Sequence, residues 1–112
     1  MGLRWYVART RPLMEYLARD RMESMGLEVF LPCSRTKRNR PGHEDVPLFP
    51  GYLFVRHDPE QRGWRWLHQV PQMLGPVAFG GEVPALPNEI IDDLIDRVSA
   101  INGTGGLWTR FM

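Results

Sequence analysis

The sequence predicts an α+β fold, in which an antiparallel sheet of about four strands is flanked by helices. Three observations lead to this prediction. Strand-like and helix-like segments follow one another in the order β-α-β-β-α-β-α, the split β-α-β arrangement of an α+β sandwich. The strand-like segments are rich in aromatic and β-branched residues. The chain has 112 residues, 43% of them hydrophobic, which suffices for one domain with a modest core.

The first two predicted elements are a strand and a helix. Residues 3–10 (LRWYVART) are predicted to form the strand. Thr10 is expected to cap the helix, with Pro12 in its first turn. Apolar residues recur at helical spacing as far as Met25, and Gly26 is expected to end the helix. Three charged residues spaced four apart are expected on its solvent side: Glu15, Arg19 and Glu23.

The middle of the chain is predicted to hold two strands and a short helix. The second strand begins at Leu27 and passes into a basic run that ends at Arg40, where Pro41-Gly42 provides a turn. The chain returns through a proline-bounded strand over residues 46–55. The short helix after that strand is expected to hold Trp64, Trp66 and Leu67.

The last part of the chain is predicted to form a fourth strand and a final helix. The strand covers residues 73–79, and Gly80-Gly81 follows as a turn. Pro87 opens the helix. Five apolar residues at helical spacing are expected to form its buried stripe: Ile90, Ile91, Leu94, Ile95 and Val98. From Asn102 to Met112 the glycine content is typical of a linker.

The strand over residues 46–55 (VPLFPGYLFV) is the most informative stretch. Because side chains alternate along a strand, Tyr52 and Phe54 share one face, while Leu53 and Val55 share the other. Both faces are therefore apolar, and a second apolar face has to be covered by something. The stretch is either a central strand covered on both sides by helices or a strand that presents aromatic residues to a partner.

Composition argues against several classes of protein and site. Cys33 is the only cysteine, so a disulfide or a thiolate metal site within the chain is excluded, and we expect a reducing cytoplasm. No apolar run approaches the roughly 20 residues of a membrane span. The three histidines show no metal-ligand spacing, and we find neither a nucleophile beside a base nor a glycine-rich phosphate loop. We therefore expect no enzyme, no cofactor and no metal site.

The net charge of +1 conceals an uneven distribution. The segment up to Arg65 holds twelve of the 14 basic residues but eight of the 13 acidic ones. This asymmetry permits a basic face and an acidic face.

A set of short motifs resembles one known family. The motifs are Trp5-Tyr6-Val7, Phe30-Leu31-Pro32, Phe49-Pro50-Gly51-Tyr52, Val70-Pro71, Gly75-Pro76-Val77 and Pro87. In this order and spacing, they resemble the N-terminal (NGN) domain of the NusG family of transcription elongation factors over residues 3 to about 100. The form Pro47-Leu48-Phe49-Pro50-Gly51-Tyr52-Leu53-Phe54-Val55 is closer to the specialised paralogues, of which RfaH is the type.

The resemblance implies a domain organisation. Residues 1–101 correspond to the NGN-like sandwich, and residues 102–112 to a linker-like tail. Family members carry a C-terminal KOW domain after such a linker, and that domain is absent from this sequence.

The resemblance also implies a partner. Family members dock on the clamp helices of the largest RNA polymerase subunit, suppress pausing and support antitermination without catalysing a reaction. The polymerase-binding residues that it implies here are Val7, Arg9, Phe49, Pro50, Gly51, Tyr52, Phe54 and Phe79. For Phe54 and Phe79, a plain core position is the open alternative. Gly63-Trp64-Arg65-Trp66 lies where the family touches the polymerase gate loop, although both tryptophans are also candidates for core anchors.

Basic residues suggest contact with upstream or non-template DNA. The candidates are Arg11, Arg21, Arg35, Lys37, Arg38 and Arg40. Phosphate contact of this kind is independent of sequence and sensitive to salt. A solvated hairpin tip is the alternative for the cluster from Arg35 to Arg40, and a surface ion pair is the alternative for Arg21. For the whole chain, the competing hypothesis is a single-stranded nucleic-acid-binding module that stacks bases on the sheet aromatics.

Overall fold

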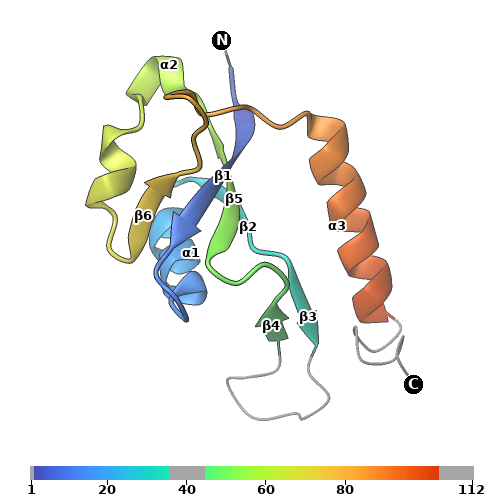
Figure 1. Ribbon diagram of the computed structural model, residues 1–112. Helices are drawn as coiled ribbons and strands as arrows, with labels where there is room; N and C mark the ends of the chain where they lie inside the picture. The colour runs from blue at the N-terminus through green and yellow to red at the C-terminus, as the bar shows by residue number, and fades with distance from the viewer. Residues whose placement is uncertain (1, 36–44, 104–112) are drawn as a thin grey trace.

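The structure is a computed structural model that describes residues 2–35 and 45–103 (Figure 1). The strands are β1 (Arg4–Thr10), β2 (Glu28–Phe30), β3 (Cys33–Arg35), β4 (Asp45–Pro47), β5 (Tyr52–His57) and β6 (Met73–Pro76). The helices are α1 (Glu15–Ser24), α2 (Pro59–Arg62), the 3-10 helix η1 (Arg65–Gln69) and α3 (Asn88–Gly103). The chain therefore has the α+β composition that the sequence predicts.

Four of the strands form one antiparallel sheet in the order β2-β5-β1-β6, and β3 pairs with β4 in a separate two-stranded sheet. The two central strands, β1 and β5, pair along their whole length, from Arg4 opposite His57 to Arg9 opposite Tyr52. Because β5 is a central strand with apolar residues on both faces, each of its faces needs something to cover it.

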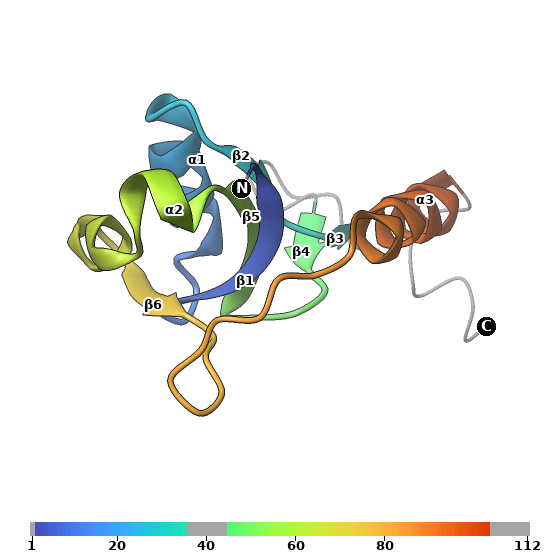
Figure 2. The same ribbon diagram turned by 90° about the horizontal axis from the view of Figure 1, so that it is seen from above.

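Helices lie on both sides of the main sheet. Seen from above, α1 and α2 lie on one side and α3 on the other (Figure 2). The hydrophobic core fills the space between α1, η1 and the sheet. Its buried residues are Tyr6, Ala8, Ala18, Met22, Leu31, Leu53, Val55, Leu67, Val70 and Met73. Among residues 2–35 and 45–103, the structure has no helix with both the length and the apolar character that a membrane span requires.

The first helix begins later than predicted. Thr10 is the last residue of β1, where it pairs with Met73, so it cannot cap α1. Pro12 precedes the helix, and Met14 occupies the N-cap position without a side-chain hydrogen bond. The strand continues to Thr10 because pairing with β6 outweighs the local capping preference. The predicted end of the helix is confirmed, since Gly26 follows the C-cap with φ of 88°.

The second predicted strand is broken in two. β2 ends at Phe30 in the main sheet and β3 starts at Cys33 in the small sheet, with Leu31 and Pro32 between them. The Pro32 carbonyl instead accepts a hydrogen bond from the Leu48 N–H at 2.8 Å. The predicted short helix is also divided, into α2 and η1. Asp58 caps α2 by accepting the Glu60 N–H at 3.1 Å.

The final helix buries a narrower stripe than predicted. Ile91 and Val98 are buried, whereas Ile90 is 54% and Ile95 is 37% exposed. The physical reason is that α3 packs mainly against β1 and β3, so only a narrow strip of its surface is covered. The helix is tied at its end to β3, where the Asn102 side chain donates to the Cys33 carbonyl at 2.9 Å.

Candidate functional site

The side of the sheet that faces away from α1 carries a group of aromatic side chains. Along β5, Leu53 and Val55 are fully buried in the core, so Tyr52 and Phe54 point to the opposite side, as the alternation predicts. Phe54 lies directly opposite Val7 of β1 and Phe30 of β2, which therefore share its face. We call the surface formed by Val7, Phe30, Phe49, Tyr52 and Phe54 the aromatic face.

Phe54 is the centre of the aromatic face. Its ring stacks on Phe30 with 6.0 Å between centroids, and Phe49 meets it edge to face at 6.5 Å. Phe54 is partly buried by these neighbours, whereas Phe49 is 45% and Tyr52 is 42% exposed. The face therefore has an ordered aromatic centre and an exposed aromatic edge.

The opposite end of the same sheet surface is closed. Trp5 of β1 lies on this side but is buried, and the chain leading to α3 runs alongside it. The Leu86 N–H donates to the Trp5 carbonyl at 2.8 Å, which holds that segment against the strand. The sheet surface is thus covered at Trp5, whereas Arg9 and Tyr52 at its other end are exposed and accessible to a partner.

Arg9 lies at the margin of the aromatic face, and Phe79 follows a segment that pairs with β1 beside it. Phe79 is 71% exposed, in the turn closed by the bridge to Glu82, so it is not a core residue. The Val77 N–H donates to the Val7 carbonyl at 2.9 Å and brings this segment alongside β1. Arg9 is exposed and sits opposite Tyr52 in the β1–β5 register. A cation therefore borders the exposed aromatic edge.

The Phe49–Tyr52 turn is fixed by hydrogen bonds on both sides of Gly51. The Tyr52 N–H donates to the Phe49 carbonyl at 3.0 Å, and Gly51 has φ of 85°, a conformation that favours glycine. The Gly51 carbonyl accepts the Thr10 N–H at 2.8 Å. The Gly51 N–H donates to Glu15 Oε2 at 2.7 Å. Strand β1 and helix α1 thus position the turn together.

The solvent-side placement predicted for Glu15 is wrong. The sequence predicts it on the solvent side of α1, but it is only 4% exposed. The four-residue spacing of Glu15, Arg19 and Glu23 predicts a row of exposed charges on one side of the helix. Of the two ion pairs in that row, the structure has the Arg19–Glu23 pair at 3.8 Å. Because α1 begins at Glu15 rather than at Thr10, the side chain of this residue lies at the helix start beside the turn, where Gly51 supplies its partner.

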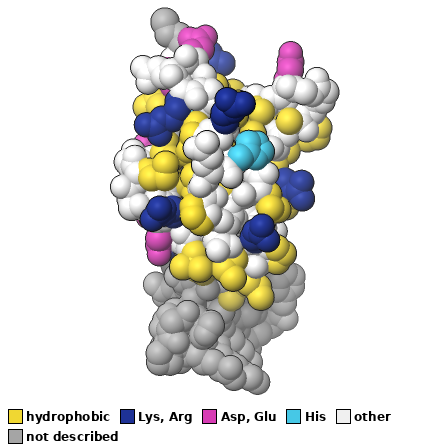
Figure 3. Space-filling model, turned by 90° about the vertical axis from the view of Figure 1, so that its left-hand side faces the viewer, with side chains coloured by type: hydrophobic (Ala, Val, Ile, Leu, Met, Phe, Trp, Pro, Cys, Tyr) yellow, Lys and Arg dark blue, Asp and Glu magenta, His cyan; other side chains and the backbone are white. Residues whose placement is uncertain are grey.

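The basic candidates are spread over several elements. Arg11 and Arg21 are exposed, and Arg35 is the last residue of β3. Lys37, Arg38 and Arg40 lie outside the described residues. On the side of the molecule that carries β6 and η1, arginine side chains are interspersed with hydrophobic ones (Figure 3).

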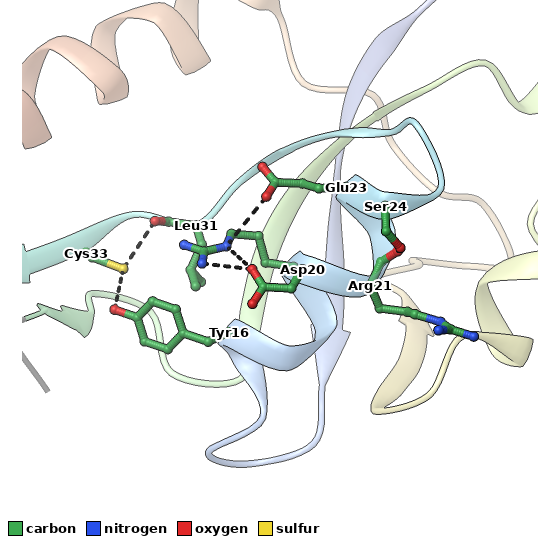
Figure 4. A network of polar contacts seen from close by, with 8 residues as sticks. Tyr16, Asp20, Arg21, Glu23, Ser24, Leu31 and Cys33 are labelled. Atoms are coloured by element: carbon green, nitrogen blue, oxygen red, sulfur yellow. Dashed lines mark hydrogen bonds and ion pairs between the residues drawn. The ribbon is translucent and has the colours of Figure 1, made fainter. Parts of the chain in front are cut away.

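Helix α1 keeps Arg21 apart from its neighbouring charges. Arg19 pairs with Asp20 at 2.9 Å and lies near Glu23, whereas the Arg21 side chain points away from that group (Figure 4). The Arg21 carbonyl accepts the Ser24 hydroxyl at 2.6 Å. Within α1, the ion pairs drawn therefore involve Arg19, and the Arg21 side chain remains directed outward.

Trp64 and Trp66 anchor the segment that follows α2. Trp64 packs edge-on against Tyr6 at 4.8 Å, and both tryptophan rings flank the buried His57. The Trp66 indole N–H donates to the Gly63 carbonyl at 3.0 Å, and His57 Nε2 lies 2.6 Å from the same oxygen. Their packing role makes these rings core anchors, while Arg65 between them is exposed.

The described residues show no grouping of ionisable side chains for catalysis or metal binding. Within residues 2–35 and 45–103, no group of three or more His, Cys, Asp or Glu side chains is arranged to hold a metal ion. Burial raises the pKa of Tyr6 above its ordinary value, and Arg4 opposes this while Asp58 and Glu60 add to it. Asp58 is occupied by capping α2 and by the Gly2 N–H at 3.3 Å.

Comparisons with known proteins agree with the fold. The family model described as "Transcription termination factor nusG" matches residues 3–97. "Transcription termination/antitermination protein NusG" of Pasteurella multocida is 25% identical over 108 residues, which cover 85% of this chain and 59% of the relative. The protein of the same name from Escherichia coli K12 is 23% identical over 111 residues, covering 88% and 61%.

A solved structure shares the fold at low sequence identity. It is titled "Domain interaction in Thermotoga maritima NusG" and matches with a TM-score of 0.57 and 22% identity, over 80% of this chain and 53% of the other. The chain thus spans about three fifths of the length of the curated relatives it matches. Because the family model covers most of the sequence, from residue 3 to residue 97, the chain belongs to the NusG family.

Proposed function

We propose that this chain is a non-catalytic factor of transcription elongation and antitermination, which acts in the cytoplasm by docking on RNA polymerase through the aromatic face. The observation that carries the proposal is the exposed edge formed by Phe49 and Tyr52 on the ordered Phe54 centre. Curated relatives named as transcription termination/antitermination proteins support the same activity.

The shape and chemistry of the aromatic face suit a helical partner. A sheet surface with rigid rings accepts an amphipathic helix or the tip of a helical hairpin, because aromatic side chains supply large contact area at little cost in conformational entropy. We therefore propose the clamp helices of the largest polymerase subunit as the partner, with Val7, Arg9, Pro50, Gly51 and Phe79 around the central contact. Since Trp64 and Trp66 pack inward, a gate-loop contact would depend on the exposed Arg65.

The docking proposal predicts an effect on elongation by this chain alone. In a paused-elongation assay, adding the chain is expected to shorten pauses, because holding the clamp requires no further domain. Polymerase with its clamp-helix tip deleted is the control, and it should not respond. Unchanged pausing combined with tight binding of single-stranded RNA or DNA in the absence of polymerase would favour the nucleic-acid-binding alternative instead.

We further propose that basic residues contact the DNA backbone near the docked polymerase. Neutralising the cluster Arg35, Lys37, Arg38 and Arg40 together is expected to weaken duplex DNA binding. The slope of log affinity against log salt should fall by roughly 0.9 for each phosphate that the variant no longer neutralises. Neutralising the outward-pointing Arg21 of α1 tests one phosphate contact in the same way, as does neutralising Arg11.

Salt titrations of DNA binding, with polymerase affinity measured in parallel, check this prediction. Polymerase affinity should hardly change in these variants, since none of the neutralised residues belongs to the aromatic face. A salt slope equal to that of the unmodified chain would identify the cluster as a solvated loop.

A further inference from the structure

We infer that Glu15 is a positioning residue for the docking surface, which it serves by holding the Phe49–Tyr52 turn through the Gly51 amide. The inference rests on the proposed docking function and deepens it, because it names a residue outside the contact surface on which the contact depends. Glu15 belongs to α1, on the other side of the sheet from the aromatic face.

The contact between Glu15 and Gly51 is short and shielded. Glu15 Oε2 accepts the Gly51 N–H at 2.7 Å, and the residue is 4% exposed. A carboxylate that accepts a backbone N–H makes a stronger bond than a neutral acceptor does, and exclusion of water strengthens it further. Without this acceptor, the Gly51 N–H would lose its partner at a position that water reaches poorly.

Gly51 transmits the contact to the aromatic edge. The Gly51 carbonyl accepts the Thr10 N–H at 2.8 Å, so the N–H and the C=O of Gly51 are both hydrogen-bonded. Phe49 and Tyr52 flank the turn, and the Tyr52 N–H closes it on the Phe49 carbonyl at 3.0 Å. A change in the orientation of Gly51 therefore moves both exposed rings relative to Phe54.

Docking surfaces depend on such supporting contacts, because a binding residue displaced by about 1 Å loses much of its fit. Other restraints on the segment include the Leu48–Pro32 hydrogen bond at 2.8 Å, the edge contact of Phe49 with Phe54 and the pairing of Tyr52 with Arg9. None of these restraints comes from helix α1. Glu15 is thus the side chain that fixes the turn from the α1 side.

The test uses the full chain and compares four variants. Glu15→Ala removes the acceptor, and Glu15→Asp shortens the side chain so that its oxygen no longer reaches the Gly51 N–H. Glu15→Gln keeps a neutral acceptor in place. The matched control is Glu23→Ala, which removes an exposed glutamate from the last turn of the same helix.

Three quantities are measured for each variant: RNA polymerase affinity, the hydrogen-exchange rate of the Gly51 amide, and Tm. Glu15→Ala and Glu15→Asp are expected to weaken polymerase binding about tenfold, the scale of one missing charge-assisted hydrogen bond, and to accelerate Gly51 exchange. Glu15→Gln should restore most of the affinity and protection, and Glu23→Ala should match the unmodified chain. If Glu15→Ala does not fold, Glu15→Asp and Glu15→Gln give the same comparison.

The outcomes separate this inference from the docking proposal. Unchanged Gly51 exchange and unchanged polymerase affinity in a folded Glu15→Ala or Glu15→Asp variant would overturn the positioning role, even where Phe49→Ala weakens binding. If the Glu15 variants accelerate Gly51 exchange but neither they nor Phe49→Ala alter polymerase binding, the docking proposal fails and the Glu15–Gly51 contact retains only a structural role.

Discussion

Replacing Phe49 with Ala is expected to weaken binding of the chain to RNA polymerase by about 2 kcal/mol or more, the scale of an interface hot spot. Phe49 is 45% exposed, and its ring and that of Phe54 meet edge to face. When a partner covers Phe49, the ring leaves water while it stays packed against an aromatic surface that is already ordered. Little of the binding energy would then be spent on arranging side chains.

The same substitution should change stability little, because a half-exposed side chain contributes only part of its area to the core. Affinity measured by titration against purified polymerase, with Tm measured in parallel, distinguishes the two effects. Leu17→Ala is the matched control, since Leu17 is a comparably exposed apolar residue on α1, away from the aromatic face. A Tm loss as large as that of a core deletion, or an affinity equal to that of Leu17→Ala, would contradict the prediction.

Leu53→Ala is expected to lower the free energy of unfolding by about 3 kcal/mol or more, within the usual range for a Leu deletion in a core. Leu53 is fully buried, pairs with Ala8 across β1, and belongs to the core that α1 covers. Ala8 is too small to fill the space that the missing side chain would leave. The cavity term therefore adds to the lost burial of apolar surface.

Urea unfolding measures this effect, and an unchanged slope with a lower midpoint would assign it to stability alone. Tyr52→Ala, one position earlier on the same strand, is the control for the opposite face. It should cost much less stability but should weaken polymerase binding. Equal stability losses in the two variants would mean that both faces of β5 are core, and the docking face would lose its main support.

The alternation along β5 could be predicted from the sequence because it follows from strand geometry. Once a segment is extended, successive side chains must point to opposite faces, so Leu53 and Val55 separate from Tyr52 and Phe54 wherever the strand is placed. The α+β class follows in the same way from the order of the periodic segments. The family motifs pointed to Phe49 as a docking residue, but the continuous strand predicted over residues 46–55 is wrong, because Gly51 with φ of 85° turns the chain between β4 and β5.

Which apolar positions are covered depended on distant parts of the chain. Ile90 and Ile95 fit the helical stripe but stay exposed, because α3 contacts the body along a narrow line. Trp5 and Phe54 both lie on the outer face of the sheet, yet the segment that reaches Leu86 closes only the Trp5 end. Spacing along one element reports which residues share a face, but it does not report what packs against that face.

Glu15 illustrates the same limit for a polar group. Its sequence context, an acidic residue in a ladder with Arg19 and Glu23, favours exposure. Its burial depends on a backbone N–H 36 residues away, at Gly51. The sequence by itself determined the α+β class, the two faces of β5 and the family. The tertiary structure alone decided which apolar face stays open and which carboxylate supports it, because burial and hydrogen-bond partners are set by long-range contacts that local periodicity does not encode.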